Sequence, residues 1–270
     1  MPAAAAKAPP AKTSPAKTGG GGPSLLARYG QQSRRPLAAL AFVLPLLALY
    51  EGGVVLLGRQ AVRNGADVWL RQFLDRFGFG QYFLLPVLTI GLLLAWHHTT
   101  RDRWQVSAGV IYLMFAECAA LGVLLLGAGQ LQGLVIQGTI GAPAPPEPAR
   151  MELVWVTAGR GAFVARMLGF VGAGVYEEML FRLMLLPPVV LMIGWLGAQR
   201  GLKIALAVAL TSALFSAAHY VGAQGEAFDA TSFSFRLLAG GFFALLFVHR
   251  GFGIAAGTHA LYDIMASLMG

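Results

Sequence analysis

The chain consists largely of long apolar runs separated by short polar links, and this pattern limits its fold more than any other feature. A helix needs about 20 predominantly apolar residues to cross the hydrocarbon core of a bilayer. The composition agrees, since 57% of the 270 residues are hydrophobic and 12% are charged, whereas soluble domains carry about 25% charged residues. This balance excludes a water-soluble globule, a disordered protein and a disulfide-stapled secreted domain. The sequence therefore predicts an integral membrane protein.

Seven runs are long enough to span a membrane, or eight if the longest is divided. They lie at 36–58, 79–96, 106–126, 152–186, 203–221, 235–249 and 252–269. A backbone inside a bilayer must satisfy its own hydrogen bonds, so we expect each run to be helical. The predicted fold class is an all-α, polytopic transmembrane helix bundle of about seven to eight spans.

The polar segments divide the chain into predicted regions. Residues 1–35, rich in Ala, Pro, Lys and Gly, are expected to form a disordered basic tail. Residues 36–126 hold the first transmembrane helices, with an amphipathic stretch at 59–78 that predicts a helix lying at the membrane interface. Residues 127–150 are interpreted as a Gly/Pro-rich connector, and residues 151–270 as a second transmembrane region.

The net charge of +8 belongs mostly to the tail. Six of the 20 basic residues precede the first apolar run, which leaves 14 basic and 12 acidic residues in the rest of the chain. By the positive-inside rule we expect the N-terminus on the cytoplasmic side of the cell (inner) membrane, close to anionic lipids. No folded basic face with aromatic readers is visible, so no nucleic-acid partner is expected. The single cysteine, Cys118, excludes an internal disulfide and a cysteine-based metal cluster.

The few ionisable residues inside the apolar runs are the candidates for function, because an intramembrane charge is costly to keep. There are eight of them: Glu51, Glu117, Glu177, Glu178, Arg182, His219, His259 and Asp263. Six of the eight fall in three short strings, YEEMLFR at 176–182, FSAAH at 215–219 and HALYD at 259–263. The other two are expected either to pair with Arg160 or Arg166 or to line an approach path.

Helix geometry separates the roles within these strings. Glu178 and Arg182 are four residues apart and can pair along one face, whereas Glu177 is turned by about 100° toward a different target. His259 and Asp263 are also four apart, so the carboxylate can orient the imidazole. Together with His219 from a separate span, this set can position and deprotonate a water molecule.

The ordered strings EExxxR, FxxxH and HxxxD resemble the motifs of the CAAX-protease and bacteriocin-processing family of intramembrane endopeptidases. The contexts GVYEEMLFR, ALFSAAHY and GTHALYDI are similar to that family as well. The resemblance covers about residues 152–269, so the 151–270 region is expected to be the protease region. It implies that Glu177 activates the attacking water with help from His219. Glu178 and Arg182 would then support that glutamate.

The resemblance further implies that His259 and Asp263 stabilise the tetrahedral oxyanion or help to hold the water. The family often has Asn at the last position, and an ionised Asp263 cannot donate a hydrogen bond. Orienting His259 is therefore the role we expect for it. Leu183 stands where Gly is common after the Arg, which alters packing beside the site.

The motifs leave the presence of a metal open. Glu177, His219 and His259 could hold a divalent ion such as zinc with an open position for water. The same residues could also act without a metal, with the glutamate as base and the imidazoles as donors.

The expected partners are membrane lipids and a peptide or protein substrate, either lipid-modified or unmodified. Two other function classes remain open at this point. One is a catalytically silent membrane scaffold of the same fold, and the other is a proton-coupled transporter that uses the same carboxylates. The absence of an internal repeat argues against a transporter, since many transporter folds carry internal symmetry.

Overall fold

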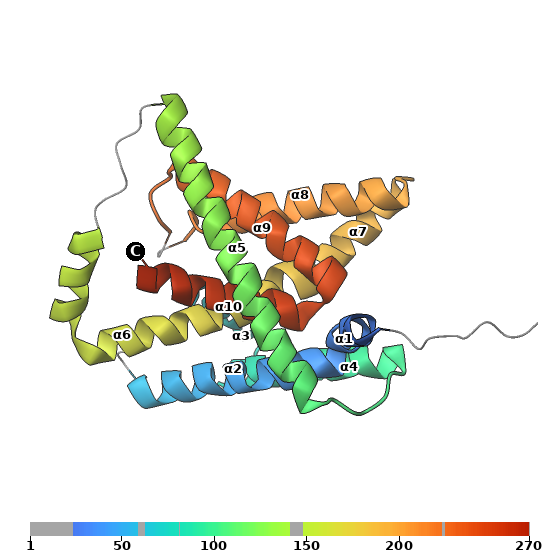
Figure 1. Cartoon of the computed structure of the whole chain (residues 1–270). Helices are drawn as coiled ribbons and strands as arrows, with labels where there is room; N and C mark the ends of the chain where they lie inside the picture. The colour runs from blue at the N-terminus through green and yellow to red at the C-terminus, as the bar shows by residue number, and fades with distance from the viewer. Residues whose placement is uncertain (1–23, 59–62, 81, 141–147, 223–224, 270) are drawn as a thin grey trace, which may run out of the picture.

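The computed structural model describes residues 24–58, 63–80, 82–140, 148–222 and 225–269, and it places almost all of them in helices (Figure 1). In chain order these are α1 (Leu25–Ser33), α2 (Pro36–Leu57), α3 (Gly65–Arg76), α4 (Leu84–Thr100), α5 (Ala108–Ile140), α6 (Pro148–Glu178), η2 (Met179–Leu185), α7 (Leu186–Trp195), α8 (Arg200–Ala218), α9 (Ala230–Arg250) and α10 (Phe252–Met269). Within these ranges no strand occurs, and the predicted all-α fold is confirmed.

In the part of the chain that the structure describes, five helical segments are long and apolar enough to cross a membrane. They are Pro36–Leu57, Ala108–Ile136, Gly161–Trp195, Arg200–Ala218 and Ala230–Arg250. The apolar helix α4 has 17 residues and is shorter than these. The structure therefore supports an integral membrane protein with five candidate spans, and the predicted count of seven to eight is not confirmed.

Two predicted boundaries differ from the structure. Helix α5 continues to Ile140 and so passes through much of the segment interpreted as a connector at 127–150. Glycine does not end a helix that is packed against its neighbours, and Phe235 packs directly over Gly129. Residues 141–147 of the predicted connector lie outside the described residues.

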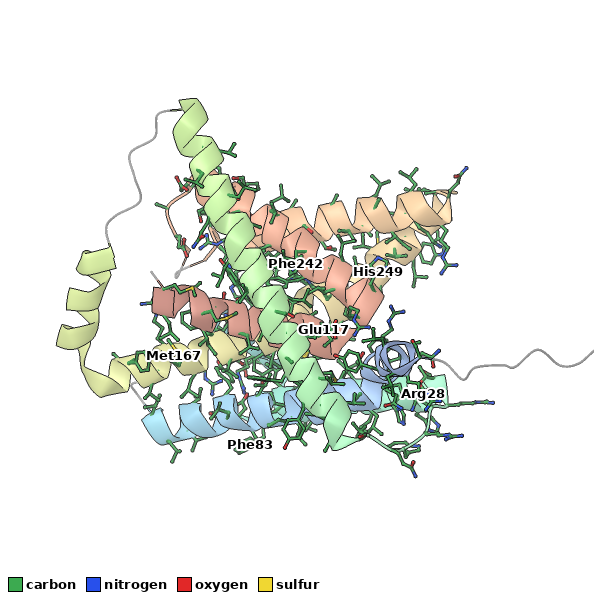
Figure 2. All side chains as sticks on the ribbon, viewed as in Figure 1. Arg28, Phe83, Glu117, Met167, Phe242 and His249 are labelled. Carbon is green, nitrogen blue, oxygen red and sulfur yellow. The ribbon has the colours of Figure 1, made fainter. Side chains whose placement is uncertain are left out.

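The predicted disordered tail also contains a helix. Helix α1 begins after Ser24, whose hydroxyl accepts the N–H of Ala27. The Tyr29 hydroxyl donates to Glu117 on α5, and Arg250 at the end of α9 forms a bidentate ion pair with the same carboxylate at 2.6 Å (Figure 2 labels Glu117). These contacts tie α1 to the bundle. Residues 1–23 of the predicted tail lie outside the described residues.

Helix α10 lies at the centre of the bundle. It packs against α2, α5, α6 and α9, and α5 crosses it in Figure 1. Its first nine residues, 252–260, are all buried. The crossing with α6 is close because Gly174 has no side chain: a Cβ there would lie 2.6 Å from the carbonyl oxygen of Ala256. The small residue thus sets the distance between two helices that both carry motif residues.

The helix that carries the first motif changes its winding immediately after Glu178. Residues Met179–Leu185 form a π-helix, and the N–H of Leu186 bonds the carbonyl of Phe181, five residues earlier. The next two residues, Pro187 and Pro188, have no N–H and their rings clash with the carbonyl four residues before them. The widened turn therefore accommodates the proline pair, and the helix continues through it to Trp195. Such π-turns occur frequently at functional sites.

Candidate active site

The structure brings the six motif residues together from three helical segments. Glu177 and Glu178 end α6 and Arg182 follows in η2, while His219 caps the C-terminal end of α8. His259 and Asp263 come from α10. The side chains that the sequence reasoning grouped by motif are thus neighbours in space.

Glu177 faces both histidines with one carboxylate oxygen. Its Oε2 lies 3.9 Å from Nε2 of His219 and 3.8 Å from Nε2 of His259. This Oε2 is buried and accepts no hydrogen bond from a described protein group. Its other oxygen, Oε1, accepts a hydrogen bond from the side-chain amide of Asn64 at 2.7 Å. The carboxylate is thus held on one side and directed at two imidazoles on the other.

Glu178 points to different partners, as the helix geometry predicts. Its Oε1 lies 2.8 Å from Nδ1 of His259, and its Oε2 lies 3.1 Å from Nε of Arg182. Both charged side chains of the Glu178–Arg182 pair are buried from solvent. The Arg182 guanidinium also donates to the carbonyl of Gly240 and lies 4.4 Å from the centre of the Phe215 ring. A buried ion pair of this kind needs such additional partners, because the desolvation of its charges is costly.

The orientation of His219 follows from its backbone contact. Its Nδ1 lies 2.9 Å from the carbonyl oxygen of Phe215, which can only accept a hydrogen bond. Nδ1 must therefore carry the proton, and Nε2 is turned toward Glu177. In the neutral imidazole Nε2 is an acceptor, and in the imidazolium it is a second donor.

The orientation of His259 depends on Glu178. Since the carboxylate of Glu178 holds Nδ1, the ring presents Nε2 to Glu177. The ring also stacks on Phe243 with centroids 4.4 Å apart. Asp263 lies 3.5 Å from the same Nε2. The carboxylate that holds the Nδ1 edge of the imidazole is thus Glu178, whereas the sequence reasoning gave the orienting role to Asp263.

A cavity of about 880 Å³ opens beside these residues. Glu177, His219, His259 and Asp263 all line it, and Phe235 belongs to its apolar wall. A second cavity of about 430 Å³ is lined by Glu177 and His219 together with residues of α3 such as Trp69. The carboxylate of Glu177 and the imidazole of His219 can therefore be reached from both cavities.

Asn64 is a site residue that the sequence reasoning missed. It precedes α3, and an Asn before an amphipathic helix indicates an N-cap rather than a contact with a residue 113 positions away. Its side chain does cap α3, because Oδ1 accepts the N–H of Ala66 at 2.8 Å. Nothing in the local pattern signals the second contact, with Glu177.

The two remaining intramembrane glutamates form ion pairs with arginines that the sequence reasoning did not consider. Glu51 pairs with Arg71 of α3 at 2.8 Å and accepts a hydrogen bond from Tyr176. Glu117 pairs with Arg250. The side chain of Arg160 lies outside the described residues.

The metal that the motifs leave open stays a prediction. Among the residues that the structure describes, no group of three or more His, Cys, Asp or Glu side chains is placed to hold an ion. Glu178 occupies Nδ1 of His259, and the carbonyl of Phe215 occupies Nδ1 of His219. The two Nε2 atoms, Oε2 of Glu177 and Oδ2 of Asp263 converge, with Oε2 at 3.8–3.9 Å from the nitrogens and Oδ2 at 3.5 Å from Nε2 of His259. We therefore derive no chemical step through a metal.

Comparison with known protein families supports the interpretation of the motifs. Residues 159–265 match the family model described as type II CAAX prenyl endopeptidase Rce1-like. This region is therefore similar to the CAAX prenyl endopeptidase family. The family predicted from the three motifs is thereby confirmed. Comparisons with curated proteins and with solved structures gave no match. The matched region contains all six motif residues and does not include Asn64.

Proposed function

We propose that the protein is an intramembrane endopeptidase that hydrolyses a peptide bond with a water molecule activated by Glu177. The observation that carries this proposal is the placement of Glu177 Oε2 opposite the Nε2 atoms of His219 and His259, at the wall of the large cavity. The family of residues 159–265 supports a peptidase. A scaffold would not need a carboxylate oxygen directed at two imidazoles.

In the proposed reaction Glu177 is the general base. A water within about 3 Å of Oε2 can also reach the two imidazoles, which hold it against a substrate carbonyl. Oε2 takes one proton as the oxygen of the water bonds to the carbonyl carbon. The protonated glutamate then delivers that proton to the departing amine as the carbon–nitrogen bond breaks, so that the enzyme returns to its starting state.

His259 is suited to stabilise the oxyanion of the tetrahedral intermediate. Three carboxylates lie within 4 Å of its ring nitrogens, those of Glu178, Asp263 and Glu177, and they favour the imidazolium form. An imidazolium held at Nδ1 by Glu178 donates from Nε2, the atom that faces the cavity. A preorganised donor of this kind is usually worth about 10²–10³-fold in rate.

The family description names a CAAX prenyl endopeptidase, and we infer that the cavity receives a substrate of that class. Its apolar wall can accommodate a lipid-modified segment, and the guanidinium groups of Arg63 and Arg236 line the same cavity. Arg63 is paired with Asp67 and Arg236 with Glu226, so an anionic peptide terminus would share these cations with the two carboxylates. We also expect the basic α1 end of the molecule to face the cytoplasm.

The proposal is tested with purified protein in proteoliposomes and a fluorogenic farnesylated peptide that ends in a CAAX sequence. We expect the wild type to cleave it, and we expect Glu177→Gln, His219→Ala and His259→Ala each to lower kcat by about 10²–10⁴-fold. The matching peptide without the lipid shows whether the lipid is required. Cleavage at the wild-type rate by all three variants would refute the proposal, and binding without cleavage by the wild type would favour a scaffold.

A chelator decides whether a metal takes part. Treatment of the purified protein with a chelator is expected to leave kcat unchanged if the side chains act alone. Loss of activity that added zinc restores would show that the reaction depends on a metal, and it would replace the base mechanism by a metal-assisted one.

A further inference from the structure

The candidate active site receives one polar contact from outside the family-matched region. Asn64 lies between α2 and α3, 95 positions before residue 159, where the matched region begins. Its side-chain Nδ2 donates to Oε1 of Glu177 at 2.7 Å. Asn64 also lines both cavities that meet at Glu177. The first half of the chain therefore touches the proposed base directly.

The orientation of the Asn64 amide is fixed by the rest of its contacts. Oδ1 accepts the N–H of Ala66, so the opposite end of the amide, Nδ2, must point toward Glu177. The backbone N–H of Asn64 donates to the hydroxyl of Tyr50 at 3.3 Å. That hydroxyl in turn donates to the buried carboxylate of Asp67 at 2.8 Å. Rotation of the amide by half a turn would break the helix cap and place two oxygens face to face.

The hydrogen bonds of Asn64 continue into a network of ion pairs on α3 and α2. Asp67 is held by ion pairs with Arg63 and Arg71. Arg71 continues to Glu51, which accepts a hydrogen bond from Tyr176, the neighbour of Glu177 in sequence. A chain of charged and hydroxyl groups thus leads from α3 through α2 back to α6. Asn64 is held in place by groups that belong to the fold rather than to the reaction.

The contact decides which oxygen of Glu177 is available. A free glutamate side chain can exchange its two oxygens by rotation about its last bond. With Oε1 bound to Asn64, Oε2 is the oxygen that faces the two imidazoles. A base that must act on a water held by other groups needs this fixed geometry, since a displacement of about 1 Å costs about 10²-fold in rate.

We propose that Asn64 is a positioning residue of the endopeptidase site, which holds Glu177 so that Oε2 receives the proton of the water. The inference rests on the proposed function, because it assigns a role within that reaction. It also gives the first half of the chain a part in catalysis, through a side chain that the family match does not contain. The competing explanation is that Asn64 serves only as the N-cap of α3.

Two substitutions separate these explanations. Asn64→Ser and Asn64→Asp keep an oxygen that can cap α3, because Ser and Asp are good N-cap residues. Ser is too short to reach Glu177, and an ionised Asp has no proton to donate. For the farnesylated CAAX peptide we expect kcat to fall by about 10²-fold in both variants, while KM stays close to wild type. We expect the thermal midpoint of Asn64→Ser in detergent to fall only by the loss of the contact with Glu177, because the cap is kept.

The matched control is a substitution that removes a helix cap elsewhere in the chain. Ser24→Ala removes the side-chain cap of α1, which lies outside both cavities, and we expect its kcat and KM to be unchanged. If the Asn64→Ser variant retains the wild-type kcat, Asn64 is a helix cap alone and the inference is wrong. A loss of kcat that merely follows the fraction of folded protein would overturn it as well.

A thermal double-mutant cycle tests the contact without a substrate. The thermal midpoints of Asn64→Ser, Glu177→Gln and the double variant are compared, with the expectation that the two shifts do not add. Additive shifts would show that the two side chains are not coupled. Failure of the wild type to cleave any peptide would overturn the proposed function. Equal cleavage by the wild type and Asn64→Ser would overturn only the role of Asn64.

Discussion

Replacement of Gly174 by Ala should separate the helix that carries Glu177 and Glu178 from the helix that carries His259. The added Cβ would lie 2.6 Å from the carbonyl oxygen of Ala256 and 2.7 Å from both the backbone nitrogen and the Cβ of Ala260. None of these atoms can rotate away, because two belong to the backbone and the third is the first atom of a side chain. Contacts between such atoms normally begin near 3.4 Å. Helix α10 must therefore move away from α6 by about 0.8 Å.

This movement acts directly on the site. His259 lies one residue before Ala260, so its Nδ1 would leave its 2.8 Å contact with Glu178 and its Nε2 would withdraw from Glu177. A displacement near 1 Å costs about 10²-fold in rate, and overpacking of a helix contact costs about 1–3 kcal/mol of stability. We therefore expect kcat for the farnesylated peptide to fall by about two orders of magnitude in a protein that still folds.

The control for this prediction is Gly127→Ala in α5, where a Cβ would meet no atom within 4 Å. We expect this variant to keep its kcat and its thermal midpoint. Steady-state kinetics in proteoliposomes and thermal unfolding in detergent measure both quantities. A wild-type kcat for Gly174→Ala would refute the reasoning from helix separation, and an equal loss in Gly127→Ala would show that any added methyl group has the same effect.

Two further predictions concern the buried charges. Glu178→Gln leaves the buried guanidinium of Arg182 without its carboxylate, and we expect a loss of about 3–5 kcal/mol in the free energy of unfolding; an unchanged denaturation midpoint would contradict this. Glu117→Leu removes the ion pair with Arg250 and the acceptor of the Tyr29 hydroxyl. It should release α1, so that trypsin cleaves after Arg28 faster than in the wild type while kcat stays the same; equal cleavage rates would show that α1 is held by other contacts.

The contact of α1 with α5 also depends on the protonation of Tyr29. Burial and the hydrogen bond to Glu117 raise the pKa of the Tyr29 phenol above its usual value. The phenol therefore remains protonated across the physiological range and keeps its donor role. The contact between α1 and α5 is thus insensitive to moderate changes of pH.

The sequence predicted those parts of the molecule in which the signal is local. The apolar runs indicate helices because a bilayer leaves the backbone few alternatives, and the four-residue spacing of Glu178 and Arg182 predicts their pairing, which the structure contains. The helix ends were less predictable. Gly and Gln near residue 130 resemble a connector in isolation, but packing against Phe235 keeps α5 helical there.

Long-range contacts were outside the reach of local patterns. Glu117 pairs with Arg250, 133 positions later, and no periodicity relates the two. The same holds for Asn64 and Glu177. The π-turn after Glu178 was also missed. Pro187 and Pro188 normally indicate a helix end, whereas here the helix widens into a π-turn before them and continues past them. The motifs identified the groups of the candidate site, whereas the helix packing determines which atoms face one another.

The position of α10 as the last described helix has a consequence for how such a protein is made. His259 follows Glu177 by about 80 residues, which at about 5–20 residues per second corresponds to a delay of about 4–16 s during synthesis. Until α10 arrives, Glu178 can already pair with Arg182 in its own helical segment, so the charges need not enter the membrane unpaired. A nascent chain would thus carry the proposed base without the imidazole that completes the site. Before His259 is made, such a chain lacks a group that the proposed reaction needs, so we expect it to be inert toward its neighbours until α10 has been added.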